Sequence, residues 1–188
     1  MQKRTSFFIL LFLSSLILLS LFPGCLPVTP TVTVNAKLLA IGDYYGGGIV
    51  AYIDGSGIHG LIAATADQST GIQWYNGSYV VTGAAGTAIG TGQANTTAIV
   101  TIQGTGSYAA QLCNDLIVSG YDDWFLPSKD ELNKLWINRV AIGGFADYYY
   151  WSSSELNANY AWSHSFFIGY QGGSNKSLSL RVRAVRAF

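Results

Sequence analysis

The chain has 188 residues, of which 11% are charged and 14% aromatic, and its ten basic side chains balance ten acidic ones. This balance gives no reason to expect nucleic-acid binding, which requires a basic surface. The length suffices for one domain with a substantial core. Scarce charge and abundant Gly, Tyr and Trp suit a loop-rich domain that uses aromatic side chains for core and contact surface.

The N-terminus has the pattern of an export signal. Lys3 and Arg4 precede a run from Phe7 to Phe22 in which every residue is apolar or Ser. A basic start, a short apolar stretch and a small residue before a break are typical of a secretory signal peptide, here over residues 1–24. The run is shorter than the roughly 20 residues of a spanning helix. An uncleaved signal anchor is the alternative.

Cys25 follows Pro23-Gly24 at the end of this run. Its position resembles a bacterial lipobox, in which the cysteine takes a diacylglycerol and becomes the new N-terminus. We therefore expect lipidation at Cys25, which anchors the chain to the membrane at the cell surface or outer membrane. The alternative is cleavage nearby, with Cys25 unmodified. Residues 25–40 are predicted to form an extended tether.

Loss of residues 1–24 removes two basic side chains and leaves eight against ten acidic ones, a net charge of −2. If Cys25 carries lipid, Cys113 has no partner, so no disulfide framework is expected despite an oxidising compartment. Cys113 is predicted to pack as a small buried hydrophobe.

Residues 41–188 are predicted to form a single domain that begins with a hairpin. Two short apolar runs, Gly48–Ile53 and Gly60–Ala64, flank the turn signal Asp54-Gly55. Residues 65–105 are rich in Gly, Thr, Ala and Asn, and we expect long loops there with room for one short helix.

Two helices are predicted next. Apolar residues at helical spacing mark the first, from Ala109 through Leu112, Cys113 and Leu116 to Ile117.

The second helix begins with a capping box from Ser128 to Glu131 and buries Leu132, Leu135 and Trp136. Asp130 and Glu131 lie in its first turn, where the helix dipole favours carboxylates, so their role is predicted to be structural.

The C-terminal third has strand-like segments at Tyr148–Trp151, Tyr160–Phe167 and Leu178–Phe188. A hairpin followed by helices and then strands predicts an α+β fold with two helices, a small antiparallel sheet and long Gly-rich loops.

Four segments are distinctive in combination: Gly120–Ser128, Tyr150–Glu155, Ala161-Trp162 and Val182–Arg186. Together they resemble one bacterial family, the C-terminal domain of collagen-like adhesins (Lcl C-terminal domain), and the resemblance covers roughly Gly42 to Phe188. It implies a C-type-lectin-like fold, similar to that of the formylglycine-generating enzyme. Phe125 departs from the family, which often has Arg at this position.

The segment from Leu156 to Leu180 also resembles the variable proteins of diversity-generating retroelements. In those systems, randomised template adenines turn AAC codons into any codon with the same last base, which cannot encode Lys, Glu, Gln, Met or Trp. Within the segment only Trp162, Gln171 and Lys176 fall outside this set. The resemblance implies a diversified segment, although any loop rich in Ser and Gly would partly satisfy the pattern.

A C-type-lectin-like fold displays variable loops on a rigid scaffold. The predicted scaffold comprises Trp124, Leu126, Trp151, Trp162, Phe166 and the strand Val182–Val185. The predicted contact positions for an extracellular protein or glycan are Leu156, Asn157, Asn159, Tyr160, Ser163, His164, Ser165, Phe167, Ile168, Tyr170, Ser174, Asn175, Ser177 and Ser179.

Among these, Phe167, Ile168 and Tyr170 are predicted to form an apolar centre with a polar rim. The alternative for Tyr160 and Phe167 is that they alternate into the core. The C-terminal arginines either favour an acidic ligand or pair with Asp122, Asp123 or Glu155.

No cofactor is expected, and His164 has no second ligand at metal-binding spacing. Formylglycine-type chemistry needs a pair of cysteines, whereas this chain offers one free Cys on a predicted buried helix face, so we expect no enzyme. A fixed-specificity carbohydrate- or matrix-binding adhesin is the alternative to a diversified receptor. The absence of a Glu-Pro-Asn or Gln-Pro-Asp motif disfavours calcium-dependent sugar binding.

Overall fold

The computed structural model describes residues 38–188, and these residues lie within one compact unit. The predicted signal peptide, Cys25 and most of the tether lie outside the described residues, so these interpretations remain predictions. None of the helices within 38–188 is long and apolar enough to cross a membrane.

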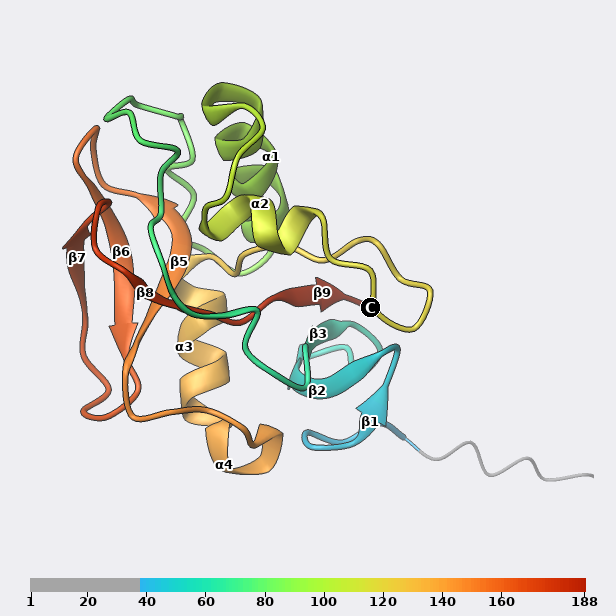
Figure 1. The fold of residues 1–188 in the computed structure, drawn as a ribbon. Coiled ribbons are helices and arrows are strands. Elements are labelled where there is room, and N and C mark those ends of the chain that lie inside the picture. Colours follow the sequence, from blue (N-terminus) through green and yellow to red (C-terminus); the bar gives the residue numbers. More distant parts are fainter. Residues whose placement is uncertain (1–37) are drawn as a thin grey trace, which may run out of the picture. The chain divides into compact units, whose positions relative to one another are not determined.

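The predicted hairpin is confirmed, and it belongs to a four-stranded antiparallel sheet. Its strands are β1 (Tyr44–Tyr45), β2 (Gly48–Ile53), β3 (Gly60–Ala63) and β9 (Val185–Ala187), in the order β1-β2-β3-β9. No other residue fits at Gly60 at the start of β3, because a Cβ there would lie 1.9 Å from the carbonyl oxygen of Tyr52. The last strand of the chain therefore completes a sheet that its first strands began (Figure 1).

A second sheet has five strands in the order β4-β8-β5-β6-β7. They are β4 (Ser69–Ile72), β5 (Tyr149–Glu155), β6 (Tyr160–Ser165), β7 (Gln171–Asn175) and β8 (Leu180–Val182). The α+β class is confirmed, but the prediction of a small antiparallel sheet is wrong in two respects. There are two sheets, and β5 pairs with β8 in parallel.

Four helices lie within the described residues instead of two: α1 (Gly92–Gln103), α2 (Ala109–Asn114), α3 (Lys129–Ile137) and α4 (Arg139–Ile142). The longest, α1, falls where loops and one short helix were expected. Its buried stripe has helical spacing but includes the polar residues Asn95 and Thr96. Asn95 donates to the carbonyl of Gly86 at 2.6 Å and Thr96 accepts from the Leu126 amide at 3.0 Å, so hydrophobic periodicity alone misses this helix.

The first predicted helix is shorter than expected, and the start of the second is confirmed. Helix α2 ends at Asn114 instead of continuing to Ile117, whose side chain is 71% exposed. In α3 the capping box is confirmed: the Ser128 hydroxyl accepts from the Glu131 amide, and the Glu131 carboxylate accepts from the Ser128 amide at 2.7 Å.

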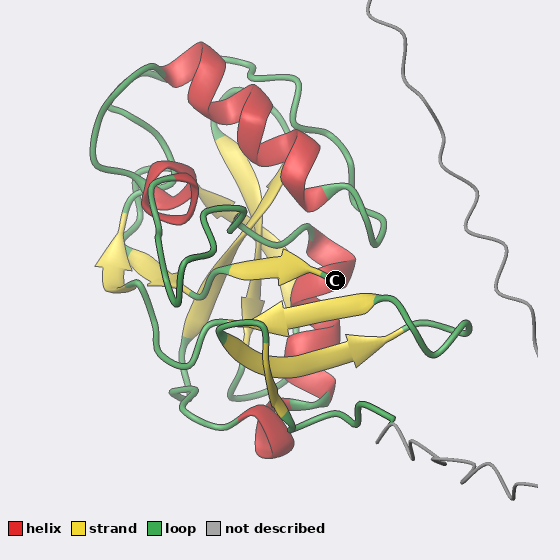
Figure 2. Ribbon diagram, turned by 90° about the vertical axis from the view of Figure 1, so that its right-hand side faces the viewer, coloured by secondary structure: helices red, strands yellow, loops and turns green. Residues whose placement is uncertain are grey.

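The core lies on both faces of the five-stranded sheet. Trp151 packs with Trp74, Trp124 and other residues beneath α1 and α2, whereas its neighbour Tyr150 packs with residues of α3 and of the four-stranded sheet. Helix α3 contacts both sheets, and in Figure 2 the strands of the four-stranded sheet lie in front of it. The predicted scaffold residues are buried, except Trp162, which is half-buried.

A cluster of charges ties the two sheets together where β8 leads into β9. Asp67 accepts hydrogen bonds from Arg181 at 2.9 Å, from Arg183 at 2.8 Å and from the Tyr150 hydroxyl at 2.9 Å. Arg183 is fully buried and also donates to the carbonyl of Ala64 at 3.0 Å. The predicted partners were therefore wrong for Arg181 and Arg183, whose acid comes from a loop distant in sequence.

Arg186, in contrast, pairs with one of the three predicted acids. Its guanidinium binds Asp123 through two hydrogen bonds of 2.6 and 2.8 Å. Glu155 pairs with Lys176 instead of an arginine.

We expect Asp67→Ala to lower the free energy of unfolding by about 3–5 kcal/mol, because it leaves the buried guanidinium of Arg183 without a counter-ion. Urea denaturation measures this change. Asp122→Ala, at an exposed position, is the control and should shift the midpoint little. A similar, small effect of both substitutions would contradict a structural role for Asp67.

Candidate functional site

The register of β5, β6 and β7 separates the two faces of their part of the sheet. Tyr150 pairs with His164, and His164 with Gln171, so these three share the face that α3 covers. Tyr149 pairs with Ser165, one residue out of step, and therefore points to the opposite face. That second face is covered at Trp151 by the core beneath α1 but is open at Tyr149.

Two adjoining hollows lie on the open side, and Tyr149 lines both. The first, about 300 Å³, is lined by Asp147, Tyr148, Tyr149, Ser165, Phe167 and Ile168. The second, about 230 Å³, lies among Tyr149, Tyr170 and Leu178.

Small residues form the floor of the second hollow. Ser163 and Ser174 lie on neighbouring strands with their hydroxyl oxygens 2.8 Å apart, and Gly172 lies beside them. A Cβ on Gly172 would lie 2.6 Å from the ring of Tyr170, so that ring rests over the glycine backbone. Large side chains at the edge and small ones in the middle produce the concave surface.

We define the aromatic face as Tyr148, Tyr149, Phe167, Ile168 and Tyr170, all of which are exposed. Phe167 is 72% exposed and Tyr170 60%. Isolated exposed apolar residues are normal, but a group around shared hollows is typical of an interaction site. The guanidinium carbon of Arg181 lies 5.6 Å from the Tyr148 ring centroid and adds a cation at the rim.

Sequence reasoning selected Phe167, Ile168 and Tyr170 but missed Tyr148 and Tyr149. It assigned the run Tyr148–Trp151 to a strand without separating its two faces. The two-residue period of a strand could have identified Tyr149, because a buried Tyr150 implies that Tyr149 faces the other side of the sheet. Phe167 and Tyr160 lie on the surface, so the alternative that they belong to the core is wrong.

The other predicted contact positions lie mainly at the far end of β6, around the β5–β6 hairpin (Figure 1). Leu156, Asn157, Asn159 and Tyr160 are exposed there. Six residues of strand span roughly 20 Å, so the predicted set divides into two groups and does not form one patch.

Three further predicted positions lie at the end of β7 and in the turn that follows it. Asn175 and Ser177 are half-buried, and Ser179 is exposed. Asn175 accepts hydrogen bonds from the Tyr79 hydroxyl at 2.8 Å and from the Ser177 amide at 3.0 Å. The side-chain carbonyl of Asn175 thus stabilises the turn that follows β7.

Three predicted contact residues are buried. His164 is fully buried between the rings of Trp136 and Phe166, at centroid distances of 5.4 and 5.5 Å, so its prediction as a contact residue was wrong. Ser163 and Ser165 are also buried and contribute to the hollows only from the floor. His164 is buried because α3 packs over its face of the sheet, while Ser163 and Ser165 are small side chains on an inner strand flanked by β5 and β7.

The three residues outside the AAC-derived codon set anchor the segment to the rest of the domain. Lys176 is fully buried and donates to Glu155 at 2.5 Å and to the carbonyl of Val80 at 3.0 Å. Gln171 donates to the carbonyl of Lys129 at 2.7 Å. The Lys129 ammonium in turn lies 4.8 Å from the ring of Trp162.

The motifs that carried the family resemblance are structural. Ser152, Ser153 and Ser154 are buried, and the Ser154 hydroxyl donates to the carbonyl of Gly86 at 2.7 Å. Phe125 pairs through its backbone with Val185, which joins the first motif to the last.

The Lcl C-terminal domain model matches residues 63–186. The chain belongs to the Lcl C-terminal domain family. No curated protein matches the chain. Family membership is consistent with a surface-exposed, adhesin-type binding role. In this Lcl C-terminal domain, the aromatic face lies outside the motifs that carried the family resemblance and beside the strands that contain them.

Neither the buried thiol nor the buried imidazole of this Lcl C-terminal domain reaches the aromatic face. Cys113 is fully buried, as predicted, and burial raises the pKa of its thiol. Burial lowers the pKa of His164 to about 4, and neither ring nitrogen has a hydrogen-bond partner among the described atoms. Within residues 38–188, no group of three His, Cys, Asp or Glu side chains could hold a metal.

We expect His164 to make the domain less stable as pH falls from about 6.5 towards 4. Over that window the unfolded chain binds a proton at this imidazole and the folded chain does not, so the free energy of unfolding decreases, by about 1–3 kcal/mol. Urea denaturation at pH 7 and pH 5 measures the loss.

His164→Phe should remove this part of the pH dependence, whereas His59→Gln, at an exposed position, should retain it. Identical pH dependence in the wild type and His164→Phe would contradict this, because it would mean that the imidazole binds its proton equally well in the folded and unfolded states.

Proposed function

We propose that this chain is a surface-displayed, non-catalytic binding protein that holds an extracellular protein or glycan on its aromatic face. The observation that carries the proposal is the gathering of exposed Tyr148, Tyr149, Phe167, Ile168 and Tyr170 around two hollows that share Tyr149.

The chemistry of this face favours a protein partner. Phe167 and Ile168 are among its most exposed side chains and offer an apolar centre, while Asp147 and Arg181 supply a charged rim. An apolar centre with a polar rim is the usual anatomy of a protein interface. Tyr side chains add large contact areas at low conformational cost. A glycan that stacks on the tyrosines is the alternative occupant.

Diversification of Leu156 to Leu180 is the finer part of the proposal. It is supported by the division of labour within the segment: Trp162, Gln171 and Lys176 anchor it, while Phe167, Ile168 and Tyr170 are exposed. A scaffold can tolerate change at exposed positions when its anchoring contacts stay constant. A fixed-specificity carbohydrate- or matrix-binding adhesin is the alternative.

Display at the cell surface rests on the N-terminal sequence pattern and on the family. The basic and apolar run over residues 1–24 supports export, and Cys25 supports a lipid anchor. A binding role, in place of catalysis, is supported by the burial of Cys113 and by the burial of His164 on the α3 side of the sheet.

Replacing Tyr149 and Tyr170 together by Ala should weaken ligand binding at least tenfold, about 1.4 kcal/mol, because both lose contact area at the hollows. Screening protein and glycan arrays with the wild type supplies the ligand, and titration of the variant measures the loss. Tyr44→Ala, an exposed tyrosine on the other sheet, is the matched control.

The melting temperature of the double variant should stay within a few degrees of the wild type. Unchanged binding would move the site away from the aromatic face. A large fall in melting temperature would instead show that the two tyrosines stabilise the fold.

Deep sequencing of the 3′ end of the gene across a cell population tests diversification. We expect substitutions between Leu156 and Leu180 that spare Trp162, Gln171 and Lys176, together with a nearby near-copy of the segment and a reverse transcriptase gene. An invariant segment with no near-copy would reject diversification and favour the fixed adhesin.

A further inference from the structure

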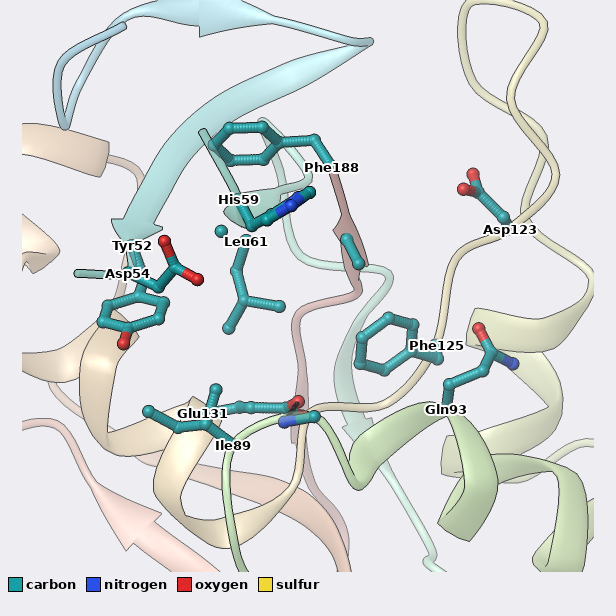
Figure 3. Close-up of a pocket in the computed structure, with 13 residues that line it drawn as sticks. Tyr52, Asp54, His59, Leu61, Ile89, Gln93, Asp123, Phe125, Glu131 and Phe188 are labelled. Atoms are coloured by element: carbon teal, nitrogen blue, oxygen red, sulfur yellow. Dashed lines mark hydrogen bonds between the residues drawn. The ribbon is translucent and has the colours of Figure 1, made fainter. Parts of the chain in front are cut away.

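A separate cavity of about 400 Å³ lies at the edge of the four-stranded sheet, and none of its lining residues belongs to the aromatic face. Its walls come from segments far apart in sequence: the β2–β3 hairpin, the loop before α1, the loop before α3, and β9. Figure 3 shows their side chains around one hollow.

The cavity wall is largely apolar and aromatic. Tyr52, Leu61, Ile89, Phe125 and Phe188 line it. Such a lining with a few polar groups is typical of small-molecule sites, and the volume lies in the lower part of their range. A small ligand therefore suits this cavity better than a polymer.

The side chains that line the cavity and can carry a charge near neutral pH are three carboxylates, of Asp54, Asp123 and Glu131, and one imidazole, of His59. Asp54 and Asp123 lie towards its rim and Glu131 at its base, and no Lys or Arg is among the described lining residues. Asp123 is already paired with Arg186. Asp54 and Glu131 form no ion pair within the described part of the chain.

The carboxylate at the bottom of this apolar cavity, Glu131, is unusual because it is fully buried. The backbone amides of Gly90 and Ser128 donate to its carboxylate, each at 2.7 Å. Burial raises the pKa of Glu131, against the opposing effect of the hydrogen bond from Ser128. In surroundings of low dielectric constant its charge is weakly screened and favours a cation nearby.

The aromatic rings favour the same ligand charge. The faces of aromatic rings attract ammonium groups. The Tyr52 ring already makes one such contact, with the Lys134 ammonium 5.2 Å from its centroid. We propose that this cavity binds a small organic cation with an apolar body, of the arylalkyl amine class. The ammonium group lies beside Asp54, and the apolar body packs against Phe125, Phe188 and Leu61.

Three probes of similar size and different charge test the proposal: 2-phenylethylamine, neutral 2-phenylethanol and anionic 3-phenylpropanoate. The full chain, in lipid nanodiscs and with ¹³C-labelled Ile and Leu methyl groups, is titrated with each, and empty nanodiscs correct for partition into lipid. We expect saturable shifts of the Leu61 and Ile89 methyls with the amine, roughly tenfold weaker binding of the alcohol and still weaker binding of the anion.

The Ile168 methyl, on the aromatic face, should not shift with any probe. Equal affinity for the three probes would reject the charge preference. Shifts confined to Ile168, or no saturable shift of Leu61 and Ile89, would reject the site. A failure of this kind leaves the proposed role of the aromatic face untouched, because the two sites share no residue.

Asp54→Asn should weaken binding of the amine several-fold and leave binding of the alcohol unchanged. The matched control is Asp147→Asn, which removes the same charge from the aromatic face and should alter neither. Gln93→Trp introduces a bulky ring from an exposed position of α1 at the cavity and should block all probes. Equal effects of Asp54→Asn and Asp147→Asn, or full binding by Gln93→Trp, would overturn the proposal.

Discussion

The pairing of Asp67 with Arg181 and Arg183 is the constraint on which the arrangement of the two sheets depends. Burial of a guanidinium is costly unless it is paired and fully hydrogen-bonded, and Arg183 meets this condition through Asp67 and backbone carbonyls of Ala64 and Gly144. These bonds fix the chain where β8 ends and β9 begins. The chain can therefore run through the five-stranded sheet as β8 and then join the four-stranded sheet as β9. The Tyr150 hydroxyl, also bound to Asp67, holds β5 beside them.

The aromatic face follows from this arrangement. Helix α3 covers the side of the five-stranded sheet that contains Tyr150 and His164, so the alternate residues from the same strands are left on the other side. Part of that side is sealed by the Trp151 core, and the remainder is open around Tyr149. Small residues at its centre and rings at its edge then make the surface concave. A rigid sheet with an exposed rim suits a binding site whose side chains change without loss of the fold.

The two hollowed regions of the domain differ in chemistry. The aromatic face is broad and exposed, with Arg181 at its rim, whereas the cavity beside Phe125 is larger than either hollow of that face and has a buried carboxylate at its base. Phe125 lines that cavity and adds an apolar ring to its wall. The two regions thus suit different ligands, a macromolecule at the first and a small cation at the second.

The sequence by itself determined the elements whose signals are local: the β2–β3 hairpin with its turn, the capping box at Ser128, the burial of Cys113 and the family. It also located the exposed Phe167, Ile168 and Tyr170. The tertiary structure decided which residues meet. The polar stripe of α1 is stable because Asn95 donates to Ser153 and Thr96 accepts from the Leu126 amide, both outside the helix. His164 is buried because α3 packs over it. Hydrogen-bond partners and covering helices come from remote parts of the chain, so no local pattern reveals them.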